Sequence, residues 1–266
     1  MKILIIGGRG FLGSHLKKYL EGQITTLSRS KSSSKNHLSV DIFDLDKIKK
    51  IIPKYDVIIN CFGLTPIKQP KKITYSQAHV VAVRNILFSL KPNQRFIHIS
   101  ALGANSDSKN EYLRTKGKAE EIIKSSKSNY LIIRPSMIFE KDCELFLSTK
   151  KTPFFPNISA KIAPVHPKDI CLAILKNQNQ NKVLELAGPQ IMSIFKFIKD
   201  YKKANNEFLF KIYKPFFIPI FYVMCKLRLF GLSNNQWSLL KIDNISSNPW
   251  PHNYIKYDEW LSKIKV

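Results

Sequence analysis

The sequence predicts an α/β fold in which a doubly wound parallel sheet is followed by a small C-terminal lobe. Short apolar runs alternate with stretches of helical spacing through the first half of the chain. Such alternation favours a parallel sheet, because a crossover helix between two strands returns the chain to the same edge of the sheet. The first apolar run also ends in a cluster of glycines, at the position where ligands of these sheets bind.

The glycine cluster lies between a strand and a helix. The strand is expected at Ile3 to Ile6, and apolar residues recur with helical spacing from Phe11 to Leu20. Glycine has no Cβ, so the backbone can turn tightly and approach phosphate oxygens, while the N–H groups of the next helix point at the anion. This order is typical of Rossmann-type dinucleotide sites, with a plain glycine turn as the alternative. The residues expected to hold the pyrophosphate are Gly7, Gly8, Arg9, Gly10, Phe11, Leu12 and Gly13.

The end of the second strand predicts which dinucleotide binds. This strand is expected at Ile24 to Leu27, and an NAD site would place Asp or Glu directly after it, to accept a hydrogen bond from the ribose 2′-hydroxyl. Ser28 and Arg29 stand there instead, and Arg9 lies inside the glycine turn. Arg can bind a 2′-phosphate through two parallel hydrogen bonds. The pattern therefore favours NADP(H) over NAD(H), and the alternative is that Arg29 is a solvated surface cation.

The remaining elements continue the alternation. Asp44 is expected to cap a helix that stops near Pro53. Further strands are predicted at 38–40, 56–61, 95–99 and 130–133, and further helices at 45–52, 73–90 and 112–123. The resulting division places a dinucleotide-binding Rossmann domain at 1–205 and a C-terminal helical lobe or tail at 206–266.

Composition narrows the class of protein. Lys and Arg number 43 against 19 Asp and Glu, which gives a net charge of +24. Such an excess could serve nucleic acid, an anionic membrane surface or an acidic partner. Most of these residues are lysines scattered along the chain, without the basic and aromatic motif of a nucleic-acid reader, so nucleic-acid binding is disfavoured. The four cysteines have no C-x-x-C spacing, so reduced thiols are expected and no metal site is indicated.

Two features predict location. The first strand begins at Lys2, which leaves no room for a signal or transit peptide, and no apolar run reaches the roughly 18 residues of a membrane span. A cytoplasmic protein is therefore expected. Segment 211–230 is rich in aromatic and aliphatic residues, with basic residues at both ends. It favours peripheral contact with the cytoplasmic face of the inner membrane or with a partner, and the alternative is packing over the substrate cleft.

Tyr112 and Lys116 form the Y-x-x-x-K pair of short-chain dehydrogenases/reductases. Residues four apart lie on one face of a helix, so a single helix can present both to the cofactor. Within the NAD-dependent epimerase/dehydratase superfamily, the chain resembles an atypical branch, the NADPH-binding accessory subunit of respiratory complex I and its bacterial relatives. The motifs that carry this resemblance are HISALGAN (98–105), YLRTKGKAE (112–120), IIRPSMIF (132–139), APVHPKDICLAI (163–174), LELAGPQ (184–190) and GLSNNQWSLLKIDNISSN (231–248).

The resemblance implies roles for particular residues. In a Tyr/Lys site the Lys cation lowers the pKa of the phenol and holds the nicotinamide ribose, while Tyr exchanges a proton with the substrate. This assigns Tyr112 and Lys116 to catalysis and to cofactor binding. A third member, a hydroxyl that orients the substrate, is either Ser100 or, if the position is that of Ala101, missing. The other implied cofactor residues are Asp41 and Ile42 at the adenine, Phe62 and Gly63 at the adenosine ribose, and Pro135 and Ser136 at the carboxamide.

Two functions remain open at this point. The resemblance implies an accessory or assembly protein of complex I, with complex I subunits as partners and NADPH in a structural role. The intact Tyr/Lys pair favours an active NADP(H)-dependent reductase or epimerase acting on an unknown small molecule. Glu140 departs from the family, which usually has Gly at this position, so its side chain either alters the wall near the nicotinamide or points outward. His98 and His166 are expected to be packing residues.

Overall fold

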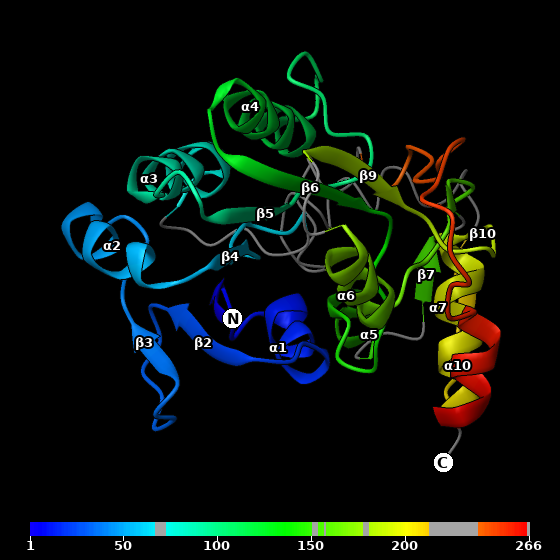
Figure 1. Cartoon of the computed structure of the whole chain (residues 1–266). Coiled ribbons are helices and arrows are strands. Elements are labelled where there is room, and N and C mark those ends of the chain that lie inside the picture. The colour runs from blue at the N-terminus through cyan, green and yellow to red at the C-terminus, as the bar shows by residue number, and fades with distance from the viewer. Residues whose placement is uncertain (67–72, 151–153, 157, 178–180, 213–238, 265–266) are drawn as a thin grey trace.

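The computed structural model describes residues 1–66, 73–150, 154–156, 158–177, 181–212 and 239–264 (Figure 1). A seven-stranded sheet with the order β3-β2-β1-β4-β5-β6-β9 forms its centre, and every pairing in it is parallel. This confirms the predicted fold class. The strands are β1 (Lys2–Ile6), β2 (Gln23–Ser28), β3 (His37–Ser39), β4 (Val57–Asn60), β5 (Arg95–Ile99), β6 (Asn129–Pro135) and β9 (Lys182–Leu186).

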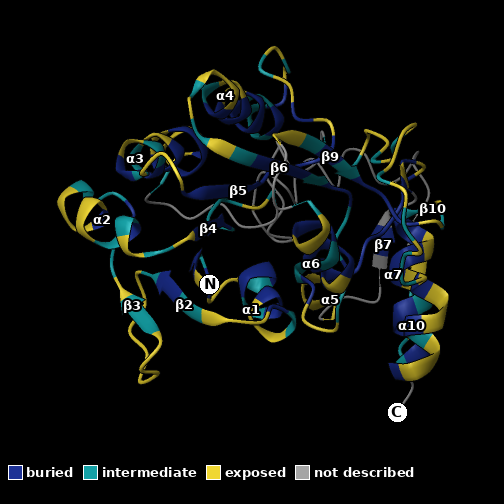
Figure 2. Ribbon diagram, viewed as in Figure 1, coloured by how far each residue is buried: buried dark blue, intermediate teal, exposed yellow. Residues whose placement is uncertain are grey.

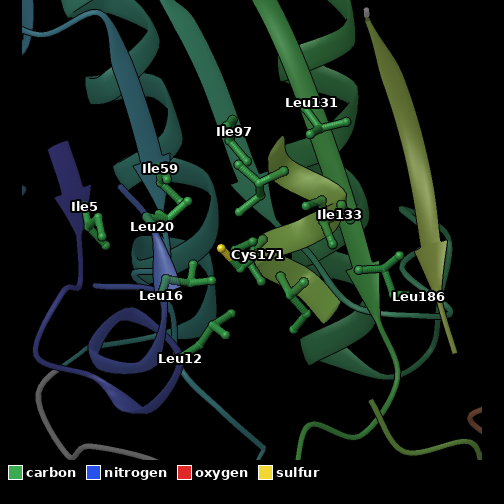
Figure 3. Packing of buried hydrophobic residues seen from close by; sticks show 14 of the residues in the cluster. Ile5, Leu12, Leu16, Leu20, Ile59, Ile97, Leu131, Ile133, Cys171 and Leu186 are labelled. Atoms are coloured by element: carbon green, nitrogen blue, oxygen red, sulfur yellow. The ribbon is translucent and has the colours of Figure 1, made fainter. Parts of the chain in front are cut away.

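Helices cover both faces of the sheet (Figure 1). On one face lie α1 (Phe11–Tyr19) and α6 (Pro167–Lys176), and on the other lie α2 (Leu45–Ile51), α3 (Ala82–Ser89) and α4 (Glu111–Ser125). The central strands are buried on both sides, which is why they are nearly continuous apolar runs (Figure 2). In Figure 3, Leu12 and Leu16 of α1 face sheet residues such as Ile59 and Ile97, close to Cys171 of α6.

Local signals account for the predicted helix at 45–52. The Asp44 carboxylate accepts a hydrogen bond from the Lys47 backbone N–H at 3.2 Å, so Asp44 is the cap that the sequence predicts. The α-helix ends at Ile51, and the short 3₁₀ segment η1 (Ile52–Lys54) contains Pro53. Proline suits this place because it cannot donate the backbone hydrogen bond that a longer α-helix needs.

The predicted helix at 73–90 is interrupted. Residues Gln77–Val81 form a π-helical turn (η2) before α3 begins at Ala82. His79 lies inside this turn, where its Nδ1 and the Thr115 hydroxyl are joined by a 2.8 Å hydrogen bond and its Nε2 lies 3.2 Å from the Leu64 backbone nitrogen. The wider turn therefore directs His79 toward α4 and toward the loop that follows β4. Single π turns of this kind occur frequently at functional sites.

A second, smaller core lies beside the sheet. Its elements are α5 (Glu144–Thr149), α7 (Ile194–Ala204) and α10 (Tyr257–Ile264), together with the pairs β7 (Phe154–Pro156) with β11 (Phe210–Ile212) and β8 (Lys161–Ile162) with β10 (Met192–Ser193). Its apolar cluster runs from Phe139 to Ile264, so it includes residues on both sides of the predicted boundary between 205 and 206. Residues 213–238, which hold most of the apolar basic segment, lie outside the described residues.

Gly117 allows α4 to approach the loop that follows β5. A Cβ at this position would lie 2.3 Å from both the Asn105 carbonyl carbon and the Ser106 nitrogen, which are backbone atoms with little room to move. The missing side chain therefore sets the distance between α4 and the loop.

Replacing Gly117 by Ala tests this close approach. In an open helix the change would stabilise the protein by about 1 kcal/mol. Here we expect the free energy of unfolding to fall by about 1–3 kcal/mol, because the backbone of the loop must move. Denaturant unfolding measures the difference, with Lys118→Ala at the next, exposed position as the control. A gain in stability for Gly117→Ala would contradict the packing described above.

Candidate functional site

Two adjoining cavities lie at the carboxyl ends of the strands. The smaller one, of about 330 Å³, is lined by the ends of β1 and β2, and the larger one, of about 420 Å³, by the residues after β5 and β6 and by α4 and α5. Gly10, Cys61 and Gly63 line both cavities. Together the cavities cross the point between β1 and β4 where the strand order reverses, which is where doubly wound sheets bind dinucleotides.

The glycine turn joins the two cavities and leaves donors free. Gly7 has φ +76°, and a Cβ there would lie 2.7 Å from the Phe62 nitrogen, so only glycine fits. The Gly10 nitrogen donates to the Gly7 carbonyl at 2.9 Å, and α1 begins at the next residue. No side chain caps α1, and its first turn holds no acidic residue. The first N–H groups of α1 are therefore available to an anionic ligand, as a pyrophosphate requires.

The smaller cavity has the polarity that a phosphate needs. Arg9, Ser28 and Arg29 line it, and no Asp or Glu is among its described lining residues. The Arg9 guanidinium donates a hydrogen bond to the Lys31 carbonyl, which holds it beside the loop after β2. The apolar side of the cavity is formed by Ile42, Phe62 and their neighbours.

Asp41 behaves differently from Ile42, with which it was predicted to frame the adenine. Its carboxylate accepts a hydrogen bond from the Phe43 N–H at 3.1 Å, and it is not among the described residues that line the smaller cavity. Val40 and Ile42 on either side of it do line the cavity. The Asp41 carboxylate is thus used within its own turn, and the structure does not bring Asp41 to the wall of the smaller cavity.

Lys116 lies on the wall of the larger cavity and is buried. Its Nζ donates to the Ile99 carbonyl at 2.9 Å, at the end of β5. Gly63 leaves room for it, because a Cβ on Gly63 would lie 3.3 Å from Nζ. Burial lowers the pKa of Lys116 to about 8, against the opposing effect of the nearby Glu120 and Cys61. The ammonium uses one of its three donors inside the protein and keeps two for a ligand.

Tyr112 lines the larger cavity one helical turn before Lys116. Its ring is held by edge contacts with the rings of Tyr75 and His79, with centroids 5.9 and 5.5 Å away. Burial, and then the neighbouring Tyr75, raise the pKa of Tyr112, so its hydroxyl is held as a neutral proton donor. The supporting roles of Tyr75 and His79 were not predicted from the sequence. The only signal for them was two aromatic residues within the predicted helix at 73–90.

Ser100 and Ala101 both line the larger cavity, but neither presents an uncommitted hydroxyl to it. The Ser100 hydroxyl donates to Glu120 Oε1 at 2.5 Å. Glu120, which is 1% exposed, also accepts hydrogen bonds from the Arg134 guanidinium at 2.9 and 2.7 Å. The Ser100 hydroxyl is therefore committed to Glu120, whose carboxylate also pairs with Arg134 and so joins α4 to β6. Ala101 has no hydroxyl.

The end of β6 brings Pro135 and Ser136 to the larger cavity, at the predicted carboxamide position. The Ser136 hydroxyl lies 2.7 Å from two acceptors on Asn244, the backbone carbonyl oxygen and the side-chain Oδ1, and donates a shared hydrogen bond to them. Asn244 thereby fixes the returning C-terminal segment to the sheet. Asp243 beside it accepts from the Lys161 backbone N–H at 2.8 Å.

Glu140 points away from the larger cavity. It accepts a hydrogen bond from His166 Nε2 at 2.9 Å and is not among the described lining residues. Burial alone would raise the pKa of Glu140, but the hydrogen bond from His166 and that from the Lys141 backbone bring it down to about 2. Glu140 therefore matches neither alternative left by the sequence: it is turned away from the larger cavity, but its side chain is only 15% exposed and is bonded to the buried His166. His98 is buried, with its Nδ1 3.1 Å from the Asn60 amide, and the described residues contain no metal-binding group of His, Cys, Asp or Glu.

Comparison with known proteins agrees with this geometry. The model of the NAD dependent epimerase/dehydratase family matches residues 3–139. The mitochondrial NADH dehydrogenase (ubiquinone) 1 alpha subcomplex subunit 9 of Dictyostelium discoideum is 26% identical over 241 residues, which are 77% of this chain and 67% of that protein. The protein of the same description from Arabidopsis thaliana is 26% identical over 71% of this chain and 54% of its own length. This chain thus spans between about half and two thirds of these relatives.

Among solved structures, dTDP-4-dehydrorhamnose reductase from Bacillus anthracis in complex with NADP superposes with a TM-score of 0.66. Its sequence identity is 16%, over 80% of this chain and 83% of the other, so the likeness supports the fold alone. The family description names NAD, which supports a nicotinamide dinucleotide as the ligand. Since the family model matches more than half of the sequence, the chain belongs to the NAD dependent epimerase/dehydratase family.

Proposed function

We propose that this chain is an NADP(H)-binding protein of the complex I accessory-subunit type, in which the nucleotide has a structural role. The observation that carries the nucleotide part is the smaller cavity, with two arginines and no carboxylate among its described lining residues. The uncapped start of α1 would hold the pyrophosphate, and Lys116 would hold the nicotinamide ribose. The relatives named as subunits of NADH dehydrogenase support the same type of partner for this chain.

The structural role of the nucleotide is supported by the larger cavity. A working reductase needs a hydroxyl that orients the substrate carbonyl, whereas Ser100 donates to Glu120 and Ala101 has none. It also gains from a Tyr whose pKa is lowered toward neutrality, whereas burial raises the pKa of Tyr112. NADPH supplies a hydride when it is bound, but these residues are poorly arranged to polarise an acceptor for it.

Attachment to a membrane-bound partner is the location that we propose, at the cytoplasmic face of the membrane. The net charge of +24 favours an anionic surface or an acidic partner. None of the helices in the described ranges is long and apolar enough to cross a bilayer. The attachment that we propose is peripheral, and segment 211–230 of the sequence is the part whose composition suits it.

The second candidate is an active NADP(H)-dependent reductase or epimerase. It is favoured by one observation, that Tyr112 and Lys116 both line the larger cavity from the same face of α4. In this case Tyr112 would donate a proton to the substrate oxygen, and Lys116 would hold the ribose and stabilise the phenolate that results.

Exchange of both arginines of the smaller cavity tests the choice of cofactor. We expect Arg9→Ala with Arg29→Ala to weaken NADPH binding by about 2–4 kcal/mol, because charge-assisted hydrogen bonds contribute about 1.5–3 kcal/mol each and both side chains are exposed. NADH binding should change by no more than a few-fold, since NADH has no 2′-phosphate. Titration calorimetry measures both affinities, with Lys31→Ala as a control for general loss of charge. Equal affinities of the unchanged protein for NADPH and NADH would overturn the assignment.

Removal of one hydroxyl separates the two candidate functions. If the protein reduces aldehydes or ketones, Tyr112→Phe should abolish NADPH oxidation, because the proton donor is gone while the ring keeps its contacts. NADPH affinity should stay within a few-fold of that of the unchanged protein. Oxidation is followed by NADPH absorbance over a panel of carbonyl compounds. Activity that survives in Tyr112→Phe would exclude the reductase built on this pair.

A further inference from the structure

The larger cavity continues past Lys116 and Pro135 into the second core. Here its wall comes from α5, from β7 and β8, from the start of α7 and from the segment before Asn244. Most side chains on this part of the wall are apolar, and they include Leu145, Phe155, Ile162, Ile194, Leu240 and Ile242. A ligand in this region would therefore meet hydrocarbon on most sides.

The polar side chains on the same wall are already hydrogen-bonded within the protein. The Ser148 and Thr149 hydroxyls donate back to the Leu145 carbonyl, at 2.8 and 3.1 Å. The Thr65 hydroxyl donates to Glu144 Oε2 at 2.5 Å, which joins the loop after β4 to α5. These groups add to Ser100, Ser136 and Asp243, whose partners are Glu120, Asn244 and Lys161.

Two polar groups on the wall, both on α4, keep hydrogen-bonding capacity for a ligand. The Tyr112 hydroxyl makes no hydrogen bond to any described residue, and the Lys116 ammonium donates only to Ile99 among them. The cavity therefore has uncommitted polar groups at one end, at Tyr112 and Lys116, while the rest of its wall is mostly apolar and the polar groups there are hydrogen-bonded within the protein.

We propose that the larger cavity binds an uncharged small molecule with a long aliphatic chain and a single carbonyl or hydroxyl oxygen. The oxygen lies at Tyr112 and the chain extends between α5 and the segment at 240–242. Burial of an aliphatic chain against this wall is favourable. A nucleotide sugar suits the wall poorly, because its phosphates and hydroxyls would lose water without gaining partners. The inference rests on the proposed function, since the dinucleotide is placed next to Lys116.

Titration of the full chain with methyl nonyl ketone tests the ligand class. The protein is first saturated with NADP⁺, which has no hydride to transfer, and this step measures cofactor binding separately. We expect the ketone to bind at least about tenfold more tightly than acetone, which shares the carbonyl but lacks the chain. UDP-glucose should show no binding. A ketone no tighter than acetone, or UDP-glucose bound more tightly than the ketone, would overturn the proposal.

Two substitutions locate the ketone in the cavity. Ile242 lines the cavity but is 46% exposed, so Ile242→Asn should leave folding intact. The variant should bind the ketone about tenfold more weakly than the unchanged protein does. Leu147, 47% exposed on α5 and not among the described lining residues, provides the control, and Leu147→Asn should bind the ketone normally. Equal effects of the two variants would contradict the proposed site. If NADP⁺ itself does not bind, the proposed function fails, and the same ketone titration of the free protein still tests the cavity.

Discussion

A single buried carboxylate, that of Glu120, fixes the helix on which the site depends. It accepts two hydrogen bonds from Arg134 on β6 and one from Ser100 after β5, so it attaches α4 to two neighbouring strands at once. Loss of one partner from a fully buried ion pair generally costs about 3–5 kcal/mol, and the cost here should be smaller because the Arg134 side chain is 21% exposed. Lys116 lies one turn before Glu120 on the same face of α4, so the contacts that hold Glu120 also hold the Lys116 ammonium at the Ile99 carbonyl. Any ligand that Lys116 binds therefore depends on this pair.

The same constraint explains why the site has two unlike parts. The hydroxyl of Ser100 is committed to Glu120 and cannot also serve a substrate. Ser136, Ser148 and Thr149 are committed within the protein in the same way, so Tyr112 and Lys116 are the groups of the larger cavity that remain for a ligand, while the second core supplies a mostly apolar wall. Asn244 connects the end of β6 to the second core. It accepts a hydrogen bond from the Ser136 hydroxyl, and it forms a parallel β-bridge with Ile162. The end of β6 therefore connects the predicted cofactor position at Ser136 with the mostly apolar part of the larger cavity.

Most of the sheet could be predicted from the sequence, because its signals are local. Apolar runs, the glycine turn and the Asp44 cap each depend on residues near in the chain, and the structure confirms the strands through β6. The π turn at 77–81 could not be predicted from local signals, and the Thr115 hydroxyl that bonds to its His79 lies 36 residues away in the chain. The second core could not be predicted either, because its contacts join segments that are far apart in the chain. Its strands have only two or three residues, and β7 pairs with β11 across more than fifty residues of chain.

The candidate site was predictable in its parts but not in its connections. The residue types at the glycine turn, at 28–29 and at 112–116 indicated the chemistry. The structure brings Gly7, Arg9, Gly10, Ser28, Arg29, Tyr112 and Lys116 to the walls of two adjoining cavities, whereas Gly8 and Gly13 are not among the described lining residues. Which hydroxyls are free could not be predicted, because it depends on partners such as Glu120 and Asn244 from distant segments. For this reason the sequence could not show whether Ser100 or Ala101 stands at the position of the catalytic hydroxyl, or that the Ser100 hydroxyl is bonded to Glu120.

Mass spectrometry of the protein captured from its own cells tests the central claim most directly, since one preparation reports both nucleotide and partners. Our account predicts about one NADP(H) for each chain, released only on denaturation, together with subunits of NADH dehydrogenase. A protein that carries NAD(H) or no nucleotide, and that elutes without any respiratory subunit, would contradict it.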